Sequence, residues 1–223
     1  MTPESMKVRD REGISVTTRP VKSRPETLAR RRDILDAAVE TFGSRGYGKG
    51  SLQAIAERVD MTHAGVLHHF GSKDQLLLEV LEHRDRTDVV GLEGQRVPDG
   101  SALFAHLVRT AFRNAERPGI VQAFVVLSAE SVTEGHPGRQ YFEDRYLNLR
   151  QSLADAFRMA CAEQGVDAPR RVDDACAAIL AVMDGLQVQW LLDPERIDLG
   201  QSSAFAIEAI ARAVGVEITL TDD

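Results

Sequence analysis

The strongest constraint on the fold is the hydrophobic periodicity of the chain. From Arg30 onward, apolar residues recur three and four positions apart, as they do along one face of an α-helix. No run of four or more residues alternates convincingly as a strand. Clusters of glycine and proline interrupt the periodicity and delimit its segments. The sequence therefore predicts an all-α fold of about nine helices.

These helices fall into two groups, four before a polar stretch over residues 91–100 and five after it. Their expected bounds are about 28–45, 52–59, 62–70, 73–90, 101–116, 119–133, 138–164, 169–192 and 201–215. The chain thus divides into a flexible arm over residues 1–27, a first helical unit over 28–90 and a second over 91–223.

Composition excludes several classes of protein. A hydrophobic content of 43% over 223 residues is enough for a substantial core. Cys161 and Cys176 lack the spacing of metal ligands, which favours buried, reduced thiols. The longest apolar stretch, Ala175 to Met183, is about half of what a membrane span needs, and the polar N-terminus does not resemble a signal peptide. We expect a cytoplasmic protein with no membrane contact.

The net charge of −7 is unevenly distributed along the chain. Residues 1–73 carry 13 Lys and Arg against 9 Asp and Glu, a net +4, whereas residues 74–223 carry 14 against 25, a net −11. Nine of the basic residues lie within the first 32 positions, where apolar periodicity is nearly absent. This segment is interpreted as a cationic arm; a solvated tail is the alternative, and phosphate contact is favoured if a DNA-binding unit follows.

Two short helices joined by a tight link, over residues 52–59 and 62–70, have the layout of a helix-turn-helix. Ser51 and Thr62 can cap them, and Ser72 with Gln75 forms a capping-box pattern that opens the next helix. Within the second helix, Val66 and Phe70 are one turn apart and would pack inward. A generic helical bundle also contains short helix pairs, so this geometry alone leaves the function open.

The residues narrow the choice. The run Ser51 to Leu76, SLQAIAERVDMTHAGVLHHFGSKDQL, resembles the DNA-binding domain of the TetR family of transcriptional regulators. The preceding helix agrees with that resemblance at Ile34, Leu35, Ala37, Ala38, Phe42 and Gly46. It covers about residues 28–81; beyond them the chain is similar to the family only in the number and length of its helices. The resemblance implies that residues 28–90 form the DNA-binding domain with its linking helix, and residues 91–223 the ligand-binding and dimerisation domain.

The resemblance implies that the helix from Thr62 to Phe70 enters the major groove, and local chemistry agrees, because its histidines offer donors and its capped start offers free N–H groups. Lys73, at the next helix start, is expected on the phosphate backbone, as in the family. Leu67 stands where most members have a backbone-contacting tyrosine. We expect DNA contacts from Arg30, Arg31, Arg32, Ser51, Thr62, His63, Gly65, His68, His69 and Lys73.

The resemblance also implies an effector pocket among the middle helices and a homodimer interface built from the last two. Candidate pocket residues mix apolar area with a few polar groups, although each could instead belong to the core. They are Phe104, Leu107, Phe124, Ser128, Tyr146 and Trp190. Glu130 lies in an otherwise apolar run, where a surface position or a structural pair is favoured over a cation-binding role.

The prediction is therefore a ligand-responsive regulator, a repressor released from a palindromic operator by a small, largely apolar effector. A transcriptional activator or a ligand-independent regulator is the alternative, and a helical enzyme or metal sensor is a remote one. We expect no enzyme, because GxSxG, P-loop and HExxH motifs are absent. We expect no cofactor and no metal, because helix geometry turns His63, His68 and His69 to different sides.

Overall fold

The computed structural model describes residues 24–88, 100–166 and 171–220, and within these ranges every regular element is a helix. The nine helices are α1 (Arg24–Lys49), α2 (Leu52–Arg58), α3 (His63–Phe70), α4 (Lys73–Asp88), α5 (Ser101–Ala115), α6 (Pro118–Glu130), α7 (Arg139–Gln164), α8 (Val172–Leu192) and α9 (Leu199–Val214). The all-α prediction is confirmed. Each helix begins and ends within a few residues of its expected bounds, while the predicted arm over residues 1–27 lies mostly outside the described residues.

The helix starts of the first unit are fixed by hydroxyl side chains. Ser51 Oγ accepts a hydrogen bond from the Ala54 backbone nitrogen, and Thr62 Oγ1 accepts one from Gly65, each at 3.1 Å. Ser72 Oγ accepts from the Gln75 nitrogen at 3.0 Å. All three predicted caps are thus present, and they set where α2, α3 and α4 begin.

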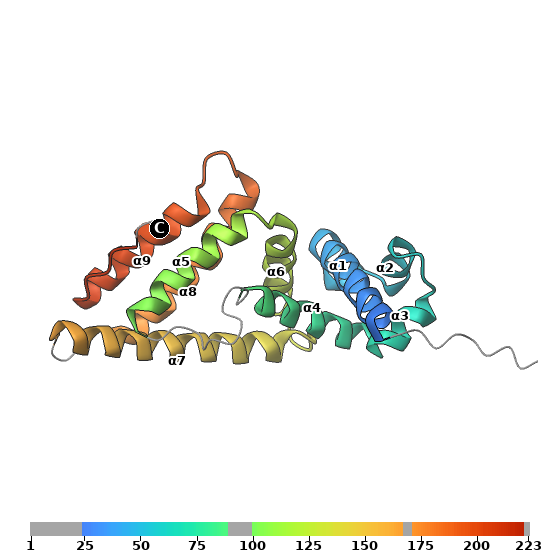
Figure 1. Ribbon diagram of the computed structural model, residues 1–223, viewed down its shortest axis with the longest axis horizontal. Helices are drawn as coiled ribbons and strands as arrows, with labels where there is room; N and C mark the ends of the chain where they lie inside the picture. The colour runs from blue at the N-terminus through green and yellow to red at the C-terminus, as the bar shows by residue number, and fades with distance from the viewer. Residues whose placement is uncertain (1–23, 89–99, 167–170, 221–223) are drawn as a thin grey trace, which may run out of the picture.

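The core of the first unit extends beyond α1–α4. It is formed by apolar faces of these four helices, including Ile34, Phe42 and Leu77, which are fully buried. Phe124 and Leu127 of α6 belong to the same core, and α1 lies directly against α6 (Figure 1). Phe142 of α7 lies in this core as well, so two helices of the second unit share it with the first unit. The sequence division at residues 91–100 did not anticipate this connection.

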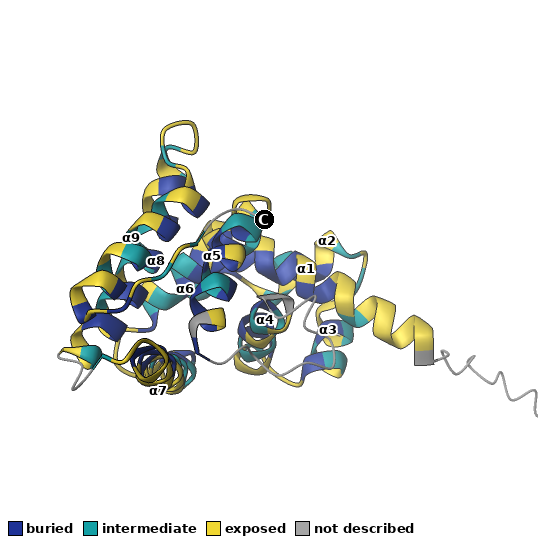
Figure 2. Ribbon diagram, turned by 60° about the vertical axis from the view of Figure 1, so that its left-hand side comes forward, coloured by how far each residue is buried: buried dark blue, intermediate teal, exposed yellow. Residues whose placement is uncertain are grey.

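A second core lies among α5, α7, α8 and α9. The rings of Phe104 and Phe157 meet there at 4.8 Å between centroids, and both are fully buried. Helix α7 runs along one side of the molecule, with α5, α8 and α9 stacked above it in Figure 1. Buried residues line the facing sides of these helices in Figure 2, while their outer sides are exposed.

By length and composition alone, α8 is apolar enough to cross a membrane. Its apolar residues extend well beyond the uninterrupted run from Ala175 to Met183. However, Ile179, Leu180 and Met183 are buried in the second core, and the helix also carries Asp184 and the buried Gln187. These features are those of a core helix.

Candidate functional site

Helix α3 presents most of its surface to solvent. Val66 and Phe70 are buried in the core, as expected from their spacing of one turn. His63, Ala64 and His68 are exposed. Because only one face is used for packing, the remaining surface of α3 can enter a groove of DNA.

Gly65 lies on the first turn of α3. A β-carbon at this position would lie 3.1 Å from Met61 Cε and 3.3 Å from Thr62 Oγ1. Glycine therefore accommodates the Met61 side chain against the helix start. This contact within the protein is one reason for a glycine here, in addition to the predicted close approach to DNA.

Arg31 holds the end of α3 in place. Its Nη1 donates to the carbonyl oxygen of His69 at 2.5 Å, its Nη2 pairs with Glu79, and its guanidinium lies 4.2 Å from the Phe70 ring centroid. By contrast, the neighbouring Arg30 and Arg32 are exposed. The three arginines that were grouped together from the sequence therefore occupy different environments, and Arg31 fixes the end of α3 from within.

Lys73 is partly buried against Tyr47. Its Nζ donates to the Tyr47 carbonyl oxygen at 2.6 Å and lies 4.2 Å from the centroid of the same ring. Burial lowers the pKa of the Lys73 ammonium, while the carboxylates of Asp74 and Glu130 oppose this shift. The lysine expected on the DNA backbone is thus held in position by the turn that follows the kink of α1.

Glu130, singled out as an acid in an apolar run, lies at this same turn. Its Oε2 accepts a hydrogen bond from the Tyr47 backbone nitrogen at 2.6 Å. Gly46, the preceding residue, has φ 71° and ψ 174°, and a β-carbon there would overlap Glu130 Oε1. Glu130 therefore forms a structural pair, one of the two interpretations favoured from the sequence, and it joins α6 to the first helical unit.

A cavity of about 330 Å³ lies among α4, α5, α7 and α8. Its lining is mostly apolar, with polar and charged groups from all four helices. The lining residues are Arg84, Asp85, Leu103, His106, Leu107, Thr110, Asn114, Arg145, Tyr146, Asn148, Leu149, Ser152, Leu153, Leu180, Met183, Asp184 and Gln187. A space of this size and character is typical of a small-molecule site.

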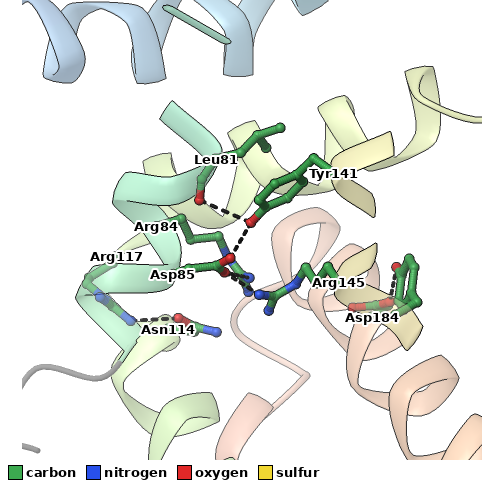
Figure 3. A network of polar contacts seen from close by, with 9 residues as sticks. Leu81, Arg84, Asp85, Asn114, Arg117, Tyr141, Arg145 and Asp184 are labelled. Carbon is green, nitrogen blue, oxygen red and sulfur yellow. Dashed lines mark hydrogen bonds and ion pairs between the residues drawn. The ribbon is translucent and has the colours of Figure 1, made fainter. Parts of the chain in front are cut away.

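Several residues of the lining belong to a network of polar contacts, which Figure 3 shows from close by. Asp85 of α4 accepts hydrogen bonds from Tyr141 and Arg145 of α7, so the two helices are joined directly. Asp184 of α8 accepts one from Tyr146 at 2.5 Å. Burial raises the pKa of Asp184, and the Tyr146 hydrogen bond and the nearby arginines oppose this shift.

Only two of the six predicted pocket residues, Leu107 and Tyr146, line this cavity. Phe104 packs against Phe157 instead, and Phe124 lies beneath the Arg84 guanidinium, 3.6 Å from its ring centroid. Ser128 bonds to its own helix at the Val125 carbonyl oxygen, and Trp190 is buried in a third small cluster with Leu199.

The polar residues of the cavity do not stand out in the sequence as its aromatic side chains do. A usable signal was nevertheless present in the sequence. Asp184 and Gln187 interrupt the apolar helix α8, and Asn114 lies on the strongly amphipathic α5. Polar groups within an otherwise apolar stripe are costly to bury, so they mark positions that face a partner or a cavity.

Apolar side chains are also exposed on the last two helices. Val188 and Leu192 of α8 are 41% and 81% exposed, and Phe205 of α9 is 75% exposed. Each helix also contributes an opposite face to the core. The exposed side chains are what remains of the apolar stripes seen in the sequence.

Two family descriptions match the sequence. Residues 34–80 match the bacterial regulatory proteins of the tetR family, and residues 102–215 match the C-terminal part of BetI-type transcriptional repressors. The second match spans half of the chain and includes α5–α9.

Individual proteins agree with these matches. The HTH-type transcriptional repressor Rv3405c of Mycobacterium tuberculosis is 31% identical over 179 residues, which cover 78% of this chain and 80% of that protein. The structure of SmeT, the repressor of the Stenotrophomonas maltophilia multidrug efflux pump SmeDEF, has a TM-score of 0.65 at 20% identity, covering 88% and 98% of the two chains. A transcriptional regulator from Saccharomonospora viridis, solved in complex with choline, has a TM-score of 0.65 at 23% identity, covering 85% and 99%.

Proposed function

Because the chain belongs to the TetR family of bacterial regulatory proteins, we propose that it is a homodimeric repressor released from a palindromic operator by a small molecule. Its membership of this family makes it a DNA-binding transcriptional regulator that responds to a ligand. The observation that carries the proposal is that α4 begins at Lys73, close to the end of α3, and reaches the cavity at Arg84 and Asp85. One helix thus belongs to both sites.

In the proposed complex, α3 enters the major groove. His63 and His68 are both exposed on the surface of α3 that the core leaves uncovered, and from their different sides of the helix each can contact a base edge or the adjacent backbone. Ser51 and Thr62 bring helix starts to the phosphates, and Lys73 adds a cation. His69 and Gly65 lie on the same helix and adjoin these contacts.

Arg30 and Arg32 extend the basic surface at the start of α1. Arg31 belongs to the interface through its hold on α3, because its polar atoms are engaged with His69 and Glu79. We assign residues 1–27 to the basic arm, residues 28–90 to the DNA-binding domain and residues 91–223 to the sensor and dimerisation domain. The arm boundary moves toward the N-terminus in the structure, because residues 24–27 already form the first turn of α1.

The second subunit covers the exposed apolar faces of α8 and α9. Val188, Leu192 and Phe205 are large apolar side chains on two adjacent helices, and a twofold axis would pair them with their copies in a four-helix interface. Such a dimer presents two α3 helices to successive major grooves about 34 Å apart.

Release follows from a shift between two populations of dimers. In one the spacing of the two α3 helices matches successive major grooves, and in the other it does not. Arg145 and Tyr141 of α7 bind Asp85 of α4 beside the cavity, so an occupant that displaces these groups also displaces α4. A rise of about 1.5 Å per residue puts Lys73 about 18 Å along α4 from Asp85. An effector that binds more tightly to the dimer whose α3 spacing does not match the DNA weakens DNA binding by about 1 to 3 kcal/mol. The protein works in the cytoplasm, by binding rather than catalysis.

Selection of bound duplexes from a random pool tests this proposal. We expect enriched sites with twofold symmetry, and light scattering should give two chains per molecule in solution. F205E and L192E should each yield monomers with weakened operator binding, whereas V132E, which replaces an exposed valine after α6, should remain dimeric. Asymmetric sites, or dimers that persist in both α8 and α9 variants, would contradict the proposal.

A further inference from the structure

The cavity among α4, α5, α7 and α8 also indicates which chemistry it accommodates. Building on the proposed sensor function, we infer that its ligand is an uncharged, mostly apolar molecule whose polar group both accepts and donates hydrogen bonds, as a carboxamide does. Three independent features of the lining lead to this class: its charge balance, the orientation of Asn114, and the burial of Gln187.

The formal charges of the lining cancel. Arg84 and Arg145 are matched by Asp85 and Asp184, with histidine counted as neutral. Arg145 pairs with Asp85, and Arg84 Nη1 lies 3.9 Å from the same carboxylate. A charged ligand would lose its hydration on entering the cavity, and the lining offers no unmatched countercharge to compensate. This loss is strongly unfavourable in a partly enclosed site. The balance therefore favours a neutral occupant.

Asn114 provides a hydrogen-bond donor with a fixed orientation. Its side chain is 1% exposed, and its Oδ1 accepts a hydrogen bond from Arg117 Nη2 at 2.8 Å. A guanidinium only donates, so the amide of Asn114 must turn its oxygen toward Arg117. Its Nδ2 has no hydrogen-bond partner among the described residues. An occupant with an oxygen acceptor would satisfy this donor.

Gln187 provides the complementary group. The residue is 4% exposed, lies on α8 in the lining, and its Oε1 has no partner within the described part of the chain. A buried acceptor without a partner is as costly as an unpaired donor. Together, Asn114 and Gln187 require one acceptor and one donor from the occupant. A carboxylate lacks the donor, a quaternary ammonium lacks both, and a neutral amide supplies both.

The rest of the lining is apolar and sets the character of the ligand body. Leu103, Leu107, Leu149, Leu153, Leu180 and Met183 surround the remaining space. The volume of about 330 Å³ is at the lower end of the usual range for small-molecule sites. A short alkyl or aryl body fits these surroundings. The exposed Asn148 and Ser152 on α7 mark the side from which the cavity opens to solvent.

Three probes with the same heptyl chain test the inference: octanamide, octanoate and heptyltrimethylammonium. Calorimetric titration of the full-length protein near neutral pH should show octanamide binding at least tenfold more tightly than either charged probe. N114D keeps the partner of Arg117 but removes the donor and adds a negative charge. It should weaken octanamide about tenfold and shift the preference toward the ammonium probe.

The Q187L variant should also weaken octanamide about tenfold, while Q122L, at an exposed position of α6, should leave it unchanged. Thermal melting checks that each variant is folded. Equal or tighter binding of either charged probe would overturn the inferred class, and so would failure of octanamide to bind. If octanamide binds in the cavity without lowering operator affinity, the class stands and the proposed sensor function is wrong.

Discussion

The carboxylate of Glu130, the last residue of α6, accepts a hydrogen bond from the backbone nitrogen of Tyr47, 2.6 Å from Oε2. The carbonyl oxygen of Tyr47 in turn accepts from Lys73 Nζ at the same distance. Tyr47, the residue after the α1 kink, is therefore held by an acid from the second unit and by the lysine that we expect on DNA. This arrangement gives the second unit a connection to the proposed DNA-binding surface in addition to α4.

Removing the Glu130 carboxylate should destabilise the protein. E130A leaves the Tyr47 N–H without this partner, and we expect it to lower the free energy of unfolding by about 1–3 kcal/mol. E130Q keeps an oxygen acceptor and should lose less. Denaturant unfolding measures both variants, and equal losses would show that the Tyr47 hydrogen bond does not carry the effect.

Gly46 should not tolerate a side chain. Its φ of 71° and ψ of 174° are unfavourable for other residues, and a β-carbon would overlap Glu130 Oε1. We expect G46A to lower the free energy of unfolding by about 1–3 kcal/mol. G48A is the matched control, because a β-carbon at Gly48 meets no atom within 4 Å. In the E130A background, the cost of G46A should be smaller, since only the backbone strain remains.

Replacing Lys73 with alanine should weaken binding to every duplex. If Lys73 neutralises one phosphate, the slope of log affinity against log salt should become shallower by about 1. Fluorescence anisotropy at several salt concentrations gives this slope. R158A removes the same charge from an exposed position on α7 and should leave the slope unchanged. An unaltered slope in K73A would show that Lys73 does not neutralise a phosphate and that its role is the contact with Tyr47.

Arg30 and Arg31 should separate DNA contact from stability. R31A removes the hold on the His69 carbonyl oxygen and on Glu79, so we expect a lower free energy of unfolding. Within the described part of the chain, Arg30 forms an exposed ion pair with Asp33 at 3.7 Å, so R30A should weaken DNA binding at nearly unchanged stability. Denaturant melts and operator titrations of both variants make the comparison, and identical effects would contradict it.

Acid should destabilise the turn around His136. Its Nδ1 accepts from the Gly138 nitrogen at 3.1 Å, which requires an unprotonated Nδ1, and burial lowers its pKa below the ordinary 6.5. The unfolded chain therefore binds the proton more readily, and stability should fall as the pH drops through about 6.5.

H136N retains an acceptor for the Gly138 nitrogen without a titrating ring, so its stability should vary less with pH in that range. H63N, which removes an exposed histidine of α3, should keep the pH dependence of the parent protein. Thermal melts between pH 5 and pH 7 compare the three proteins. A slope in H136N as steep as in the parent would assign the dependence to other groups.

The sequence by itself determined the helices, their caps and the helix-turn-helix layout. These features depend on residues three or four positions apart, such as Ser51 with Ala54 or Val66 with Phe70. Interactions of such short range can be derived from the order of residues alone. The assignment of the family was equally local, because it rested on one continuous block around α2 and α3.

Only the tertiary structure decided which residues face the cavity and which connect the two units. An amphipathic stripe shows that a helix has a buried face but not which helix covers it, so Phe104 and Trp190 could not be separated from Asn114 and Gln187. Arg31 and Glu79 are 48 positions apart, and Tyr47 and Glu130 are 83 apart. Contacts across such separations depend on how whole helices pack, and helix packing is set by the combined shape of many side chains.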